Sequence, residues 1–202
     1  MNLPPYWEDA KTHLRAADTA MADLIAAYHG EEGLQNRGDP FQTLIRAIVG
    51  QQISVKAAAA VWERVCAAHT ITPAHLKSAT HDALLACGLS GRKVQYIQGI
   101  ATAFAEDNMT FDHLSAMPDE EIIQYLTHLP GIGRWTAEMF LIFALQRPDV
   151  LPLADLGLLK GFEVHYQKTR EDLTAHATHW VPYRTVATWY LWRKLDPEVV
   201  AY

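Results

Sequence analysis

The sequence predicts an all-α protein, built as a two-lobed bundle of about ten helices. Apolar residues recur three or four positions apart through most of the chain, which is the period of an amphipathic helix. Alternating runs of β-branched and aromatic residues, which mark strands, are missing apart from a few short stretches. Half of the 202 residues are hydrophobic, so the chain can bury a sizeable core without disulfide or metal support.

The first half of the chain divides into helices at residues that cap or break them. From Trp7 to His29 the apolar residues keep a helical spacing, which predicts one amphipathic helix. Asp39 and Pro40 supply an N-cap and a first-turn proline for a second helix, which ends near Val49. Further helices are predicted from Ser54 through Trp62, over Pro73–Ser78 and His81–Cys87, and from Arg92 to Phe104.

The second half contains a helix start at Met117–Glu121, where acidic residues in the first turn complement the helix dipole. We expect that helix to run to Thr127. Other helices are predicted over Arg134–Leu145, Glu171–His179 and Pro182–Leu195. The 202 residues are expected to form a single unit with two lobes. One lobe comprises residues 40–130, and the other comprises residues 1–39 and 145–202.

Charge and composition limit the classes of function that this protein can have. The net charge is −6, yet residues 41–105 carry six Lys or Arg against two acidic residues, and a local basic face can steer a polyanion. Two cysteines, Cys66 and Cys87, are too few for a disulfide framework, a zinc site or a four-cysteine cluster. The ten histidines lack ligand spacing. No apolar stretch is long enough for a membrane span and no secretory signal is evident, so a reduced cytoplasmic protein, nucleoid-associated if bacterial, is expected.

The most informative stretch joins two predicted helices and reads Leu-Pro-Gly-Ile-Gly-Arg-Trp-Thr-Ala over residues 129–137. Gly131 and Gly133 permit positive φ and leave the backbone open to a close approach. Gly133 also comes just before a helix, where free amide groups and the dipole favour an anion. A phosphate could therefore be held by the main chain, although any tight turn between helices can use two glycines.

The complete string resembles the hairpin of the helix-hairpin-helix DNA glycosylase superfamily of base excision enzymes. In that family the hairpin amides, together with a bound monovalent cation, grip one phosphate of the damaged strand. The resemblance implies that the phosphate-binding residues are Gly131, Gly133, Arg134 and Thr136. It implies that Na⁺ or K⁺ binds the backbone carbonyls of Thr127, Leu129 and Ile132, whereas catalysis requires no cofactor.

A second motif follows about twenty residues past the hairpin, where the family places its catalytic aspartate in a segment like Leu-Pro-x-x-Asp-Leu-Gly. Residues 151–157 read Leu-Pro-Leu-Ala-Asp-Leu-Gly, which nominates Asp155. A helix of about twelve residues climbs about 18 Å, and residues 146–154 can return by about 27 Å if extended. We therefore expect Asp155 to lie close beside Gly133, in an active-site cleft between the lobes.

Two further motifs complete the resemblance, which covers about Phe41 to Trp192 with four motifs in order. Gln-Gln-Ile-Ser at residues 51–54 resembles the segment that reaches into the duplex beside the target base, which implies that Gln52 is the wedge. Residues 180–192 resemble the last helices of the alkylbase branch, where an aromatic residue lines the base pocket. The implied pocket residues are Trp135, Trp192, Met139 and Leu156, although longer relatives often have tyrosines at the last two positions.

The branch of the superfamily is predicted from features of other branches that this sequence does not have. Bifunctional relatives carry a lysine two residues after the second hairpin glycine, and this chain has Trp135 there. The four-cysteine cluster of the thymine-glycol and adenine-mismatch branches is not expected either, and neither is the additional N-terminal domain of longer bacterial alkylbase glycosylases. The chain thus resembles the short form of the DNA-3-methyladenine glycosylase II branch. The implied activity is monofunctional: the protein flips N-alkylpurines such as 3-methyladenine from double-stranded DNA and hydrolyses the N-glycosidic bond, without lyase activity and as a monomer.

Other interpretations stay open from the residues alone. Asp155 could be only an N-cap, and Trp62, Trp180 and Trp189 are expected to serve the core. Arg92 and Lys93 could bind phosphates, with Arg134, or form a solvated pair. Within the enzyme class the alternative is a mismatch uracil or thymine glycosylase, which acts on neutral bases. Outside it, the alternative is a non-catalytic helix-hairpin-helix module that binds DNA without needing Asp155.

Overall fold

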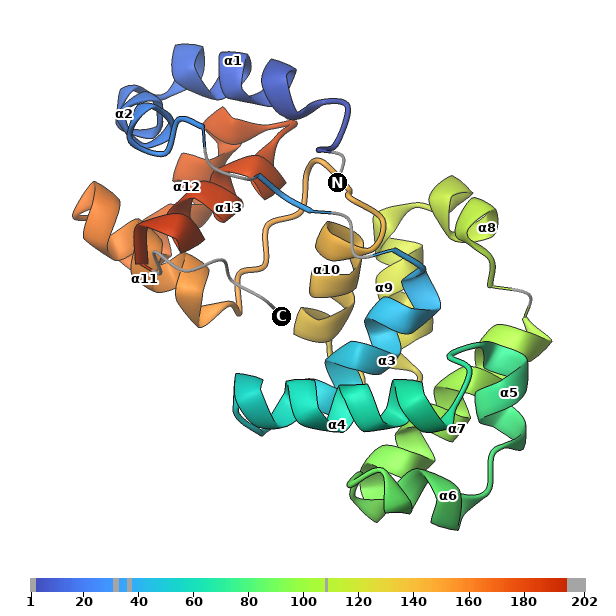
Figure 1. The fold of residues 1–202 in the computed structure, drawn as a ribbon. Helices are drawn as coiled ribbons and strands as arrows, with labels where there is room; N and C mark the ends of the chain where they lie inside the picture. Colours follow the sequence, from blue (N-terminus) through green and yellow to red (C-terminus); the bar gives the residue numbers. More distant parts are fainter. Residues whose placement is uncertain (1–2, 31–32, 36–37, 108, 196–202) are drawn as a thin grey trace. The chain divides into compact units, whose positions relative to one another are not determined.

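The computed structural model describes residues 3–30, 33–35, 38–107 and 109–195 (Figure 1). Within these residues it contains thirteen α-helices, two 3₁₀ helices and no strand, which confirms the predicted all-α class. In chain order the helices are α1 (Trp7–Ala17), α2 (Thr19–Ala27), α3 (Pro40–Gly50), α4 (Val55–Ala68), α5 (Pro73–Ser78), α6 (His81–Ala86), α7 (Gly91–Glu106), α8 (Phe111–Ala116), α9 (Asp119–Thr127), α10 (Arg134–Phe143), α11 (Leu156–Tyr166), η1 (Arg170–Asp172), α12 (Leu173–His176), η2 (Ala177–Trp180) and α13 (Arg184–Leu195). None of the described helices is long and apolar enough to cross a membrane.

The chain divides into two compact units. The described residues of Met1–Asn36 and Leu141–Ala201 form the first, which we call the terminal unit. The described residues of Arg37–Phe140 form the second, which we call the continuous unit. Residues from both ends of the chain thus share one core, whereas the other core comes from a single stretch of sequence.

The core of the terminal unit forms around α13, which contacts α1, α2, α11 and η2. Trp180 and Trp189 are buried, which confirms the core role predicted for them, and Trp62 on α4 is half-buried. Trp7 of α1 packs edge-on against Trp189, with ring centroids 5.3 Å apart. Such edge-to-face contacts between buried aromatic rings add to the free energy gained from their burial. The N-terminal helix is therefore anchored on the last helix of the chain.

The core of the continuous unit forms around α7, which packs against α3, α5 and α6. The residues Val94, Ile97, Ile100, Ala101 and Phe104 are buried at helical spacing along α7. Several short helices around it begin at a side-chain cap, as α5 and α6 do at Thr72 and Thr80. These caps explain why helices of only six residues were predictable, since each satisfies an amide that the helix itself cannot pair.

The prediction of one helix from Trp7 to His29 is wrong, because the chain breaks at Asp18 into α1 and α2. Asp18 has an extended backbone, with φ −150° and ψ 108°, and its Oδ1 accepts a hydrogen bond of 3.1 Å from the amide of Met21. The apolar spacing continues across the break, so periodicity alone does not reveal it. The carboxylate of Asp18 therefore begins a new helix where the pattern predicts continuation.

Two other elements differ from their predictions. The helix α8 was missed, because its six residues bury only Leu114 and give no measurable periodicity. The predicted helix Glu171–His179 is divided into η1, α12 and η2. Asp172 accepts a hydrogen bond of 3.0 Å from the backbone N–H of Thr169, which forms a tight 3₁₀ turn in place of a regular helix start. Pro182 then follows η2, and a residue without an N–H ends a helix readily.

Candidate active site

Asp155 caps the N-terminus of α11 and is almost completely buried, with 3% of its surface exposed. Its Oδ1 accepts a hydrogen bond of 2.6 Å from the amide of Leu158. The preceding chain turns back on itself, because the amide of Asp155 donates to the carbonyl of Pro152 over 2.8 Å. Cap and turn together fix both the backbone and the carboxylate of Asp155 before any ligand binds.

The indole of Trp192 lies directly on this carboxylate. Its Nε1 donates a hydrogen bond of 2.7 Å to Oδ1 of Asp155, and the side chain is buried within α13. The Phe143 ring stacks on Trp192, with centroids 5.9 Å apart and an interplanar angle of 11°. Two of the sequence-predicted site residues are therefore in direct contact, and each holds the other in place.

Gly157 makes this contact possible. A methyl group built on Gly157 would lie 3.0 Å from Cδ1 of Trp192 and 3.1 Å from Oδ1 of Asp155, which is tighter than ordinary carbon contacts. The glycine of the Asp-Leu-Gly segment thus leaves room for the indole to reach the carboxylate. The sequence motif contained this residue but not its role, and no sequence pattern indicated Phe143.

The glycine hairpin forms as predicted, as a short turn from α9 to α10. Gly131 has φ +90°, and a Cβ there would collide with the ring of Tyr96, so both conformation and space require glycine. Ile132 donates its amide to the carbonyl of Leu129 over 3.2 Å, which closes the turn. Gly133 is exposed and stands immediately before α10, where the first amides of a helix have no partner within it.

Two predicted phosphate ligands on α10 differ in their surroundings. Thr136 is buried, with 7% of its surface exposed. Both terminal nitrogens of Arg134 bind Glu120 at 2.9 Å, and its Nε binds Glu138 at 3.1 Å. The hydrogen bonds that Arg134 donates to Glu120 raise the pKa of Arg134, and the same contact lowers the pKa of Glu120. A DNA phosphate would therefore compete with Glu120 for the guanidinium, and a phosphate role for Arg134 stays a prediction.

The turn from α3 to α4 carries the predicted wedge. We call residues Gln51–Ser54 the wedge loop. Gln52 is exposed and has φ +59°, a left-handed conformation that is unusual for a residue other than glycine. Gln51 donates its side-chain amide to the carbonyl of Gly131 over 3.0 Å. The wedge loop and the hairpin are thus joined by a direct hydrogen bond.

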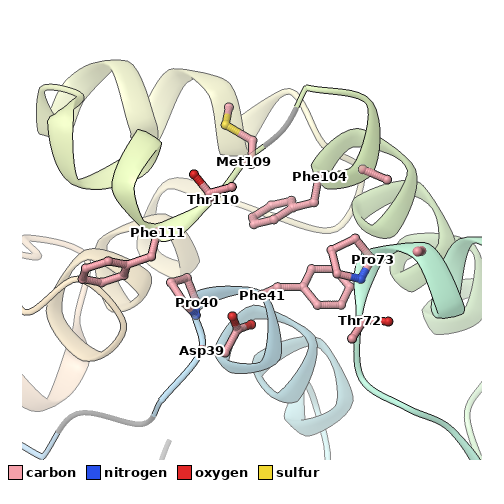
Figure 2. Close-up of a pocket in the computed structure, with 11 residues that line it drawn as sticks. Asp39, Pro40, Phe41, Thr72, Pro73, Phe104, Met109, Thr110 and Phe111 are labelled. Atoms are coloured by element: carbon pink, nitrogen blue, oxygen red, sulfur yellow. The ribbon is translucent and has the colours of Figure 1, made fainter.

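The other predicted pocket residues belong to α10 and α11. Trp135 is half-buried and Met139 buried on α10, whereas Leu156 at the start of α11 is 78% exposed. Among the described residues, no group of three or more His, Cys, Asp or Glu side chains could hold a metal ion. A separate hollow of about 460 Å³ opens in the continuous unit beside Phe41, Phe104 and Phe111 (Figure 2). None of the predicted site residues lines it.

A helical fold with a glycine hairpin and a buried, fixed aspartate is the architecture of a known class of DNA repair enzymes. This chain belongs to the HhH-GPD superfamily of base excision DNA repair proteins, because the profile of that family matches residues 45–182. Within it, the chain is 33% identical to DNA-3-methyladenine glycosylase 1 of Schizosaccharomyces pombe over 196 residues, which cover 91% of this chain and 86% of the relative.

Solved structures show the same likeness. A 3-methyladenine DNA glycosylase of Schizosaccharomyces pombe in complex with abasic DNA superposes with a TM-score of 0.78 and 32% identity, covering 92% of this chain and 95% of that one. A DNA-3-methyladenine glycosidase of Bacillus halodurans superposes with a TM-score of 0.81 and 36% identity, covering 91% and 87%. The resemblance read from the motifs is thereby confirmed at the level of the family and the fold.

Proposed function

We propose that this protein is a DNA glycosylase of base excision repair, which hydrolyses the N-glycosidic bond of N-alkylated purines such as 3-methyladenine. Its similarity to DNA-3-methyladenine glycosylases over nine tenths of the chain supports this substrate class. The observation that carries the proposal is the contact of 2.7 Å from the Trp192 indole to the buried carboxylate of Asp155. A buried carboxylate held this firmly supports a proposed electrostatic role for Asp155 in addition to capping α11.

The chemistry that Asp155 supplies is stabilisation of positive charge. Cleavage of an N-glycosidic bond passes through a sugar with oxocarbenium character, as in other glycoside cleavage. A fixed carboxylate next to that sugar stabilises the charge, and it can orient or deprotonate the attacking water. Because Leu158 and Trp192 already fix Oδ1 of Asp155, little reorganisation is needed when the charge develops.

The aromatic residues suit a leaving base that already carries a charge. An N3- or N7-alkylated purine is cationic, so it leaves without first being protonated. The faces of aromatic rings attract such a cation by about 0.5–2 kcal/mol, and Trp192 and Phe143 stack close to Asp155. Leu156 at the start of α11 belongs to the same unit as Trp192 and Phe143 and completes the pocket proposed for this unit.

We propose a monofunctional reaction that leaves an abasic site and an intact strand. Trp135 takes the position after the hairpin at which bifunctional relatives carry a lysine, and an indole has no amine to attack the sugar. Water is then the nucleophile, which suits the role given to Asp155. The partner is double-stranded DNA, and the enzyme is expected to act as a monomer.

We propose that the hairpin carbonyls of Thr127, Leu129 and Ile132 bind a monovalent cation. Among the described residues, the carbonyls of Thr127 and Ile132 accept no hydrogen bond, and that of Leu129 accepts one from Ile132. Oxygen donors of this kind suit Na⁺ or K⁺, which would add positive charge beside the amides that bind the phosphate. Replacing Na⁺ and K⁺ by tetramethylammonium at constant ionic strength should weaken binding to abasic DNA. Equal affinity in both buffers would rule the cation out.

The test of the function is release of bases from methylated duplex DNA, with the strand followed on a denaturing gel. We expect 3-methyladenine in the supernatant and strand breaks only after alkali. In Asp155→Asn, one carbonyl oxygen remains for Leu158 and Trp192, so DNA binding should persist while release falls by about 10³-fold. Asp112→Asn, which alters an exposed carboxylate on α8, serves as the matched control.

Each alternative result has a defined meaning. Release of uracil or thymine from mismatches without 3-methyladenine would favour an enzyme for neutral bases. Binding of duplex DNA with no base release, unchanged in Asp155→Asn, would favour a non-catalytic module. Strand breaks without alkali would contradict the monofunctional reaction.

A further inference from the structure

We propose that Lys93 and Gln51 are positioning residues that tie the wedge loop to the phosphate-binding hairpin, so that insertion of Gln52 and grip on the phosphate occur together. The inference rests on the proposed function and on the wedge role of Gln52. It concerns contacts within the continuous unit alone, where α3, α7 and the hairpin all lie.

The ammonium of Lys93 binds main-chain carbonyls at the end of α3 and in the wedge loop. From α7 its Nζ donates hydrogen bonds of 2.7 Å to the carbonyl of Val49 and 2.8 Å to the carbonyl of Gln51. The last carbonyls of a helix lack partners within it, so this ammonium satisfies the C-terminal end of α3 and complements its dipole. Burial at this position lowers the pKa of Lys93. From the sequence Lys93 could bind a phosphate or be solvated, whereas in the structure it binds the protein backbone.

The second tie runs from the wedge loop to the hairpin. Gln51 donates its side-chain amide to the carbonyl of Gly131, and the ring of Tyr96 lies where a Gly131 side chain would be. Lys93 and Tyr96 stand three residues apart, so they lie on the same face of α7. One turn of α7 therefore contacts both the wedge loop and the hairpin.

The conformation of Gln52 shows why such ties are needed. A non-glycine residue at φ +59° is strained and persists only where its surroundings fix it. The carbonyl of Gln51 belongs to the peptide bond that enters Gln52, and Lys93 holds that carbonyl. Without Lys93, the wedge loop can relax to an extended or helical conformation, which would move the Gln52 side chain.

The experiment compares Lys93→Met and Gln51→Leu in the wild-type background and in Gln52→Ala. The loss of these hydrogen bonds should lower kcat/KM for 3-methyladenine release by about tenfold for Lys93→Met. In Gln52→Ala the same substitution should change kcat/KM less than twofold, because no wedge remains to be positioned. Lys93→Arg should restore part of the activity.

Lys77→Met is the matched control. Lys77 pairs at 2.8 Å with Glu106, the last residue of α7, so its loss also removes a lysine contact to that helix. It should leave kcat/KM unchanged. A general loss of packing would instead lower activity equally in both backgrounds, and equal losses of that kind would overturn the proposal.

A fluorescence measurement tests the positioning role of Lys93 independently of base release. Duplex DNA with 2-aminopurine next to an abasic site reports unstacking by its fluorescence, without base release. We expect the increase on binding wild-type protein to be lost in Lys93→Met and Gln52→Ala but kept in Lys77→Met. Wild-type protein that releases no base would refute the substrate class only. An unchanged signal in Lys93→Met would refute the positioning role, and Gln51→Leu repeats the test if Lys93→Met fails to fold.

Discussion

At the scale of single residues, the contact of Trp192 with Asp155 depends on Gly157, which has no side chain. Two donors to the carboxylate, the Leu158 amide and the Trp192 indole, meet at Oδ1. The indole reaches that oxygen across the surface of Gly157, which offers no Cβ. Glycine is normally unfavourable inside a helix, so its presence in the first turn of α11 indicates a packing requirement.

Substitution of this glycine tests the requirement. In Gly157→Ala, the added methyl group would lie about 3 Å from both Trp192 and Asp155, so one of them has to shift. We expect kcat for 3-methyladenine release to fall by about tenfold with little change in KM, because a catalytic group is displaced by a fraction of an ångström. Single-turnover rates measure the effect directly.

Gly99→Ala on α7 is the matched control. No heavy atom lies within 4 Å of a Cβ built there, so alanine should stabilise the protein by up to about 1 kcal/mol through helix propensity. Catalysis should be unaffected. A Gly157→Ala variant that matches Gly99→Ala in both rate and stability would show that the space beside Trp192 is not needed.

The part of the site that could be predicted from the sequence also differs from residue to residue. Asp155 and Gly131 stand in strings that are specific enough to be recognised, and their local structure follows from cap and turn chemistry. For Lys93 a phosphate contact and a solvated position both stayed open, because the sequence does not show whether the ammonium binds a carbonyl inside the protein. The stacking of Phe143 on Trp192 joins residues far apart in sequence, so no local pattern contains it.

At the scale of elements, the division of the N-terminal region into α1 and α2 depends on a network of distant donors. Oδ2 of Asp18 lies 2.7 Å from Tyr166 Oη, 2.9 Å from His176 Nε2 and 2.9 Å from Trp180 Nε1. These three partners come from α11, α12 and η2. Asp18 also caps α2 locally through Met21, but the apolar spacing continues across the break, and the other partners of its carboxylate lie more than a hundred residues away, so no local pattern contains them.

The network also predicts a dependence of stability on pH. Burial by itself would raise the pKa of Asp18, but hydrogen bonds from Trp180, Tyr166, Met21 and His176 outweigh it and lower the pKa to about 2. Since the unfolded value is near 3.8, Asp18 contributes about 2 kcal/mol of stability above pH 4. That contribution is lost as the pH falls from 4 towards 2.

Urea unfolding of wild type and Asp18→Asn measures this contribution. At pH 7 the variant should be less stable by about 2 kcal/mol, because a neutral amide accepts these hydrogen bonds more weakly. The difference should shrink as the pH falls below 4. Asp23→Asn, an exposed position on α2, should stay within about 0.5 kcal/mol of wild type throughout. A difference for Asp18→Asn that is constant from pH 7 to pH 2 would contradict the assignment.

At the scale of the whole molecule, the proposed roles are distributed over the two compact units. The hairpin, the wedge loop and Lys93 belong to the continuous unit, whereas Asp155, Phe143 and Trp192 belong to the terminal unit. The residues proposed to bind the DNA backbone and those proposed to cleave the bond are thus carried by different cores. This separation agrees with the order of the motifs along the chain, in which the DNA-contacting segments precede the catalytic one.

The discontinuity of the terminal unit has a consequence for how the protein is made. On the ribosome, the continuous unit has all of its packing partners before residue 141 is added, so it can fold during translation. Helices α1 and α2 emerge first but bury their apolar faces against η2 and α13, which emerge last. Trp7, Leu14 and Met21 therefore stay exposed while nearly the whole chain is synthesised. The apolar faces of α1 and α2 are thus a place where a chaperone would bind during synthesis, and that exposure ends when α13 leaves the exit tunnel.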